Sequence, residues 1–87
     1  MTLRERLLDA IIDGNFGNGI TVTRKEFMNY FSDENPDTTG CFLSNSEITT
    51  GLPHSPNYTH FTLRMDTGQY RIHPKAIEER MKERGFL

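Results

Sequence analysis

The sequence predicts a small α+β domain in which helices precede and follow a β-hairpin. Apolar residues recur at helical intervals near both ends of the chain, in residues 3–12 and again in residues 76–81. Between these segments, residues 61–74 (FTLRMDTGQYRIHP) alternate apolar and polar side chains on both sides of a glycine, which is typical of a tight hairpin. The 87 residues are enough for one domain, 1–87, with a modest core.

The first two helices are predicted from a repeated capping signal. A Thr-x-x-Glu capping box occurs at residues 2–5 and again at residues 23–26. The first box begins a helix over residues 2–13, and the second begins a helix that ends near residue 32. A very short β segment is expected at residues 20–22, just before the second helix.

A third helix is expected over residues 39–49, with Thr38 or Thr39 as its N-cap. Its glycine and its several serine, threonine and asparagine residues lower its helix propensity. Its polar side would present Ser44 and Asn45, and it carries no Arg or Lys.

The hairpin is the most sharply patterned part of the chain. Its alternation predicts one apolar face made of Phe61, Leu63, Met65, Tyr70 and Ile72. The opposite, polar face would carry Arg64, Gln69 and Arg71, with Thr62 and His73 further out. Gly68 can supply the positive φ that a short connection needs.

The last helix is expected from Pro74 through Arg84, because proline is favoured in the first turn of a helix. His73 precedes this proline and is suited to act as the N-cap. Arg80 and Arg84 lie four residues apart and can extend a basic surface along the helix, although Glu83 interrupts it.

The predicted order is helix, short strand, helix, helix, hairpin, helix, which is the order of a winged helix. The segments NPDTTGCFLSNSEI and HSPNYTHFTLRMDTGQYRIHP together resemble small winged helix-turn-helix modules attached to restriction-type nucleases and related phage proteins. The resemblance covers about half of the chain. It implies binding of double-stranded DNA through Ser44 and Asn45 in the third helix and Arg64, Gln69 and Arg71 in the hairpin. The chain departs from those modules because its third helix has no basic residue, and these 87 residues include no nuclease domain.

The charge distribution favours a local rather than a general basic surface. The formal net charge is −2, which argues against broad non-specific binding to nucleic acid. Residues 1–50 carry eight acidic and four basic residues, whereas residues 51–87 carry four acidic and six basic ones. Any basic surface is therefore expected at the hairpin and the last helix. His60, at the start of the hairpin, is a further candidate for a phosphate contact.

The sequence offers no constellation for catalysis, a cofactor or a metal. The single cysteine, Cys41, excludes an internal disulfide and a multi-thiolate site. His54, His60 and His73 are scattered, and no two of them have the spacing of a helical metal site. No apolar stretch approaches the length of a membrane span and the N-terminus is charged, so a cytoplasmic protein is expected.

These observations lead to two hypotheses. The first is a non-catalytic winged-helix domain that binds DNA, with Arg64 and Arg71 in the wing contacting the phosphate backbone. The alternative is a small accessory protein of the phage type that inhibits or recruits a protein partner. Winged helices also serve as dimer or partner platforms, so the fold does not separate the two hypotheses, and a homodimer stays open under either.

Overall fold

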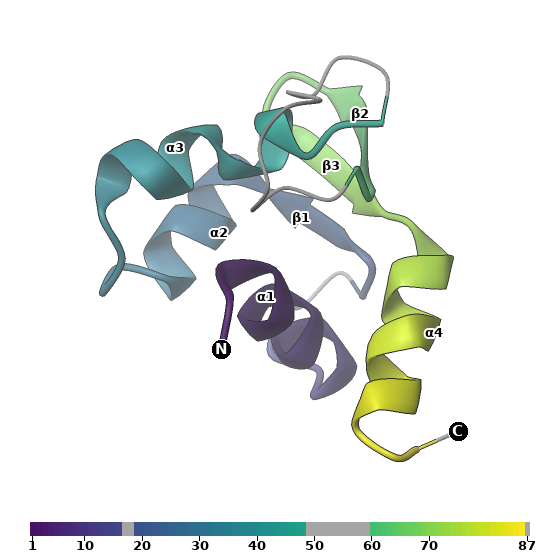
Figure 1. Cartoon of the computed structure of the whole chain (residues 1–87). Helices are drawn as coiled ribbons and strands as arrows, with labels where there is room; N and C mark the ends of the chain where they lie inside the picture. Colours follow the sequence, from purple (N-terminus) through teal and green to yellow (C-terminus); the bar gives the residue numbers. More distant parts are fainter. Residues whose placement is uncertain (17–18, 49–59, 87) are drawn as a thin grey trace.

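The computed structural model describes residues 1–16, 19–48 and 60–86, and these residues form an α+β fold (Figure 1). Four helices and three strands follow one another in the order α1 (Leu3–Ile12), β1 (Thr21–Thr23), α2 (Arg24–Tyr30), α3 (Pro36–Asn45), β2 (Thr62–Asp66), β3 (Gln69–Ile72) and α4 (Pro74–Glu83). The strands make one antiparallel sheet in the order β1-β3-β2. The predicted α+β class and the predicted order of elements are confirmed. No helix of the described ranges is both long and apolar enough to cross a membrane.

Both predicted capping boxes are present. The Thr2 hydroxyl accepts the Glu5 backbone N–H, and the Glu5 carboxylate accepts the Thr2 backbone N–H at 2.9 Å. Thr23 and Glu26 make the same reciprocal pair at the start of α2. His73 caps α4 as expected, because its Nδ1 accepts the backbone N–H of Lys75 at 3.0 Å.

The start of α3 differs from the prediction. The helix begins at Pro36, three residues before the expected start, and its N-cap is Asn35 rather than Thr38 or Thr39. The Asn35 side chain accepts the backbone N–H of Asp37 at 2.8 Å, and proline needs no donor at the first helical position. Helix α3 ends at Asn45, so the predicted end is wrong: residues 46–48 are not helical, and residue 49 lies outside the described ranges.

The hairpin has its predicted turn, with Gly68 at φ +69°, but the predicted faces of β2 are wrong. Thr62 is fully buried, whereas Leu63 and Met65 are 42% and 56% exposed. Residues directly opposite each other in a sheet share a face. Thr62 pairs with Ile72 and Arg64 pairs with Tyr70, so both side chains lie on the same face of the sheet as these two buried residues. Thr62 is buried there, whereas Arg64, nearer the tip of the hairpin, is exposed.

A buried hydroxyl explains why Thr62 lies inside. Its Oγ1 donates to the carbonyl oxygen of Leu43 at 2.8 Å, near the end of α3. Its backbone is held as well, because Thr62 N donates to Ser46 O and Thr62 O accepts from Ile48 N. The strand is thereby fixed in this register against the end of α3.

Replacing Thr62 by valine is expected to destabilise the domain by about 1 to 2 kcal/mol, although valine has a similar shape and is more apolar. The reason is that the buried carbonyl of Leu43 would lose its side-chain donor. Urea unfolding followed by circular dichroism measures this. Thr67→Val at the exposed turn is the matched control and is expected to change little. Equal stability of Thr62→Val and the natural protein would contradict this role of the hydroxyl.

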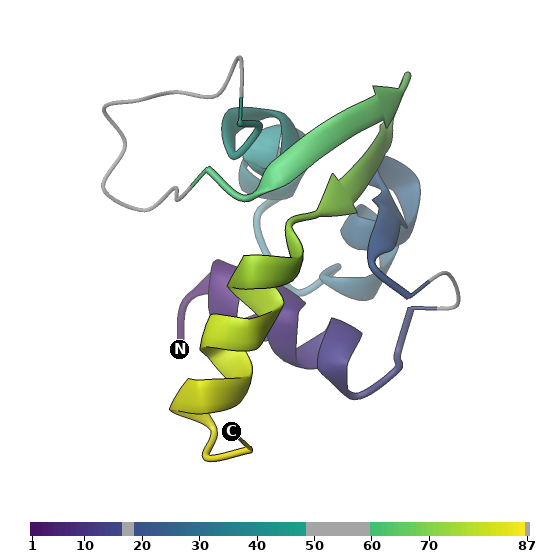
Figure 2. The same cartoon turned by 90° about the vertical axis from the view of Figure 1, so that its right-hand side faces the viewer.

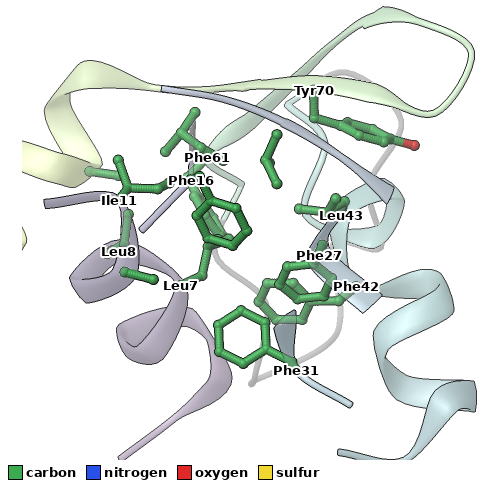
Figure 3. Packing of buried hydrophobic residues seen from close by; sticks show 14 residues of the cluster. Leu7, Leu8, Ile11, Phe16, Phe27, Phe31, Phe42, Leu43, Phe61 and Tyr70 are labelled. Atoms are coloured by element: carbon green, nitrogen blue, oxygen red, sulfur yellow. The ribbon is translucent and has the colours of Figure 1, made fainter. Parts of the chain in front are cut away.

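The core lies between the sheet and the first three helices, and α4 closes one end (Figures 1 and 3). Phenylalanines from α2, α3 and the start of the hairpin pack at its centre. The Phe27 ring lies 5.0 Å from Phe31 and 5.4 Å from Phe42, centroid to centroid. Figure 2 shows that the hairpin runs from the start of α4 to a tip that lies far from α4.

Candidate nucleic-acid interface

A shallow, open groove lies between the start of α2 and the tip of the hairpin. We call it the cationic groove, and its lining residues are Thr23, Arg24, Lys25, Arg64, Thr67, Gly68, Gln69 and Tyr70. Three of these side chains carry a positive charge, and none of the described residues that line the groove carries a carboxylate. Arg24, Lys25 and Arg64 are all exposed.

Backbone pairing brings the two sides of the groove together. Strand β1 leads directly into α2 and pairs with β3, so that Thr23 lies opposite Gln69. The backbone N–H of Arg24 then donates to the carbonyl of Gly68 at 2.8 Å. The first residue of α2 is therefore tied to the tip of the hairpin, although 44 residue positions separate them.

The cations of the groove are held to different degrees. Arg24 Nε donates to the carbonyl of Gly40 in α3 at 2.9 Å, which places its guanidinium against α3. A Cβ at position 40 would lie 2.9 Å from Arg24 Nη2, so a side chain there would shift the guanidinium from its present position. Lys25 and Arg64 form no ion pair with any acidic side chain in the described ranges. They are available to an external anion.

The cations of α4 are not available in this way. The Arg80 guanidinium donates to both oxygens of Asp9, at 2.8 and 3.0 Å, and to Glu5 at 3.0 Å. Arg84 contacts Asp9 at 3.5 Å and Asp13 at 3.2 Å. The predicted basic surface along α4 is therefore wrong, since acidic residues of α1 neutralise both arginines.

The contacts in this cluster shift the pKa values of Asp9, Glu5 and Arg80. The hydrogen bond from Arg80 holds the pKa of the Asp9 carboxyl below its usual value, and the charges of Arg80 and Arg84 act in the same direction. The pKa of Glu5 is also lowered, first by the backbone N–H and hydroxyl of Thr2 and then by Arg80. The pKa of Arg80 is raised by its hydrogen bond to Asp9.

The structure separates the residues that the sequence placed on one polar face. Arg64 and Gln69 line the cationic groove. Arg71 pairs with Leu63 and so lies on the other face of the sheet from Arg64, which pairs with Tyr70. Arg64 and Arg71 therefore cannot both contact one segment of a DNA phosphate backbone from the same face of the sheet.

The other predicted contacts lie apart from the groove. Ser44 is exposed on α3 and its hydroxyl donates to Cys41 O at 3.1 Å, while Asn45 is half-buried. His60 lines a different pocket, at the base of the hairpin. Their contact with nucleic acid stays a prediction.

Of the four acidic residues near α3, two are paired with Arg6, one is buried, and Asp37 is exposed. Asp33 and Glu34 both bind Arg6 of α1. Glu47 is 3% exposed, and its carboxylate accepts the backbone N–H of Arg64 at 3.3 Å. Asp37 is exposed in the first turn of α3. An approaching phosphate backbone thus meets fewer free carboxylates than the sequence suggests.

Arg24 and Lys25 are the groove residues that the sequence analysis missed. A signal for them exists, because they occupy the two central positions of the Thr23–Glu26 capping box. The first turn of a helix favours acidic side chains, so two adjacent cations there are not explained by helix stability. Their proximity to the hairpin depends on the pairing of β1 with β3, which local patterns do not reveal.

The arrangement can bind anions, and its residue types match those that contact DNA phosphates. The described residues contain no group of three or more His, Cys, Asp or Glu side chains that would hold a metal ion, and His54 lies outside the described ranges. Comparison of the chain with protein-family models, with curated proteins and with solved structures found no match.

Proposed function

We propose that this protein is a winged-helix domain that binds double-stranded DNA without catalysing a reaction. The order of elements supports the winged-helix assignment, as does a sheet in which the second strand of the hairpin pairs with the short strand before α2. In this assignment α3 is the recognition helix and the β2-β3 hairpin is the wing.

The observation that carries the proposal is the cationic groove. It gathers Arg24, Lys25 and Arg64 from two segments that are distant in the sequence, on a chain whose net charge is negative. Most of the other cations are used in contacts within the protein, as the pairs of Arg6, Arg80, Arg84 and Lys82 show. Free cations concentrated beside a projecting hairpin are suited to contact a phosphate backbone.

The proposal predicts a salt dependence of defined size. If the three cations each neutralise one phosphate, log K falls with log salt concentration at a slope of about −2.7. A rise from 50 to 200 mM salt should then weaken binding by about 40-fold. The Lys25→Gln/Arg64→Gln double variant should bind roughly ten- to a hundredfold more weakly at low salt, with a slope closer to about −1. Fluorescence anisotropy with a labelled duplex measures both quantities.

Two single variants serve as matched controls. Lys82→Gln removes an exposed cation of α4 that pairs with Glu78 at 3.4 Å, and it should leave binding unchanged. Arg71→Gln removes a wing arginine on the other face of the sheet. If Arg71→Gln weakens binding as much as the double variant, the groove is not the main contact. If the natural protein shows no salt-sensitive binding to any duplex at micromolar concentration, the DNA-binding function is wrong.

A protein partner is the second candidate, and exposed apolar side chains favour it. Leu63, Met65 and Ile48 are all more than 40% exposed. Ile48 and Leu63 line a small apolar cleft with Ile72 and Pro74 beside Arg71. A pull-down from the native host with and without nuclease separates the two functions. Partners held through DNA are lost after nuclease treatment, whereas a direct protein partner is retained.

A further inference from the structure

A second hollow lies at the base of the hairpin, away from the cationic groove at its tip. It is formed where α1, the start of β2 and the start of α4 meet, and we call it the basal pocket. Its lining residues are Arg4, His60, Phe61, His73, Lys75, Ala76 and Glu79. Its volume is about 230 Å³. Four of the lining side chains are basic residues, and they come from three segments that are distant in the sequence.

Arg4 is held in this pocket by an aromatic ring rather than by a carboxylate. Its guanidinium carbon lies 5.4 Å from the centroid of the Phe61 ring, which is a cation–π contact. Its Nε is buried and has no hydrogen-bond partner among the described residues. Arg6, two residues later, pairs instead with Asp33 and Glu34. The positive charge of Arg4 is therefore not neutralised within the described structure.

Three other side chains that line the basal pocket, those of His73, Lys75 and Glu79, come from the start of α4 and its N-cap. Because His73 Nδ1 accepts the backbone N–H of Lys75, the neutral ring carries its proton on Nε2, which can donate. The Lys75 ammonium forms no ion pair in the described structure. Glu79 is the one carboxylate that lines the pocket, and it lies beyond ion-pair distance of both Arg4 and Lys75. The lining therefore carries at least one net positive charge.

We propose that the basal pocket binds a single phosphate group. The volume lies below the range of about 300 to 1,000 Å³ that is usual for drug-sized ligands, so the pocket suits a small anion or the terminal group of a larger molecule. Arg4 of α1, His73 and Lys75 line one hollow, so their N–H groups can reach different oxygens of a tetrahedral anion. Arg and Lys are the side chains that bind phosphate oxygens most strongly. This site is separate from the cationic groove and does not depend on binding there.

A titration with inorganic phosphate at constant ionic strength tests the proposal, with chloride as the balancing anion. In ¹H–¹⁵N correlation spectra, the amides of Lys75 and Ala76 should shift and saturate. Lys75→Gln should weaken phosphate binding about tenfold through the loss of one charge-assisted contact. Glu79→Gln should strengthen it about threefold or more, because it removes the carboxylate that opposes the anion. Lys82→Gln, on the same helix but outside the pocket, should bind phosphate as the natural protein does.

Arg4→Gln is the other informative variant, but it also removes the contact with Phe61. Lys75 and Glu79 are both exposed and form no ion pair within the described ranges, so Lys75→Gln and Glu79→Gln decide the question even if Arg4→Gln unfolds. Shifts that grow linearly without saturating, or equal affinities in Lys75→Gln, Glu79→Gln and the natural protein, would overturn the proposal.

Two further probes identify the source of the phosphate group. A short oligonucleotide is titrated with and without a 5′-phosphate. Preference for the phosphorylated form supports the end of a nucleic acid as the ligand. Saturation by inorganic phosphate with no preference between the oligonucleotides supports a small phosphorylated molecule instead.

Discussion

Phe27→Ala is expected to destabilise the protein by about 4 kcal/mol, the largest single effect that we predict. Phe27 is fully buried at the centre of the core. Its ring is stacked on Phe42 of α3 and contacts Phe31 at the end of α2, so its removal opens a cavity between two helices and the sheet. A domain of this length has a total stability of roughly 4 to 13 kcal/mol. The variant would therefore lose a large part of its stability.

Urea unfolding at 25 °C followed by far-ultraviolet circular dichroism measures the loss. Asn29→Ala, on the exposed side of the same helix, is the matched control and should stay within about 0.5 kcal/mol of the natural protein. Phe27→Leu should lie between the two, because leucine refills part of the cavity. If Phe27→Ala is no less stable than Asn29→Ala, the packing of α2 on α3 described above is wrong.

The elements fixed by short-range chemistry are the ones that the sequence predicts best. The capping boxes at Thr2 and Thr23, the His73 cap and the positive φ of Gly68 each depend on residues within a few positions of one another. The start of α3 was missed because Asn35 and Pro36 together make a stronger cap than the threonines that follow. Both Asn35-Pro36 and the two threonines are local signals for a helix start, and the helix begins at Pro36 because proline is favoured in the first turn.

The faces of the hairpin were predicted only in part, because alternation alone does not say which side is buried. Tyr70 and Ile72 are buried as expected, since β3 lies in the middle of the sheet. On β2 the buried residue is Thr62, whose hydroxyl donates a hydrogen bond to the carbonyl oxygen of Leu43. A polar side chain can occupy a buried position where an apolar one is expected if it has a hydrogen-bond partner there. In this case the partner lies in α3, so the alternation within the hairpin does not reveal it.

The candidate site shows the same limit of local patterns. Arg64 and Gln69 were identified because they belong to a conspicuous hairpin, whereas Arg24 and Lys25 lie in the first turn of α2, far from the hairpin in the sequence. The pairing of β1 with β3 and the hydrogen bond between Arg24 and Gly68 bring the two segments together. The contact of Arg80 with Asp9 likewise joins residues 71 positions apart, and it turns an expected basic surface into an internal ion-pair cluster.

Asp9→Asn is expected to destabilise the protein by about 2 kcal/mol at neutral pH, the second large effect that we predict. Asp9 is the centre of the cluster between α1 and α4, where it accepts two hydrogen bonds from Arg80 and contacts Arg84. Its side chain is only 19% exposed and that of Arg80 only 11%, so water compensates poorly for the loss of the carboxylate. Asp13→Asn is the matched control, because Asp13 lies at the exposed edge of the same cluster and should cost less than about 0.5 kcal/mol.

Acidification should reproduce the effect of Asp9→Asn in the natural protein. The pKa of Asp9 is lowered in the folded state, first by the hydrogen bond from Arg80, so the folded protein binds a proton at this carboxyl less readily than the unfolded chain does. The stabilisation is therefore fully present above the unfolded pKa of about 4 and is lost as the pH falls through the lower folded value.

Urea midpoints measured from pH 7 down to about pH 2 should show the natural protein and Asp9→Asn converging, because the natural protein loses the charge that the variant already lacks. Asp13→Asn should instead keep most of the acid dependence of the natural protein. A difference between the natural protein and Asp9→Asn that stays constant over this range would show that the charge of Asp9 does not hold α4 against α1.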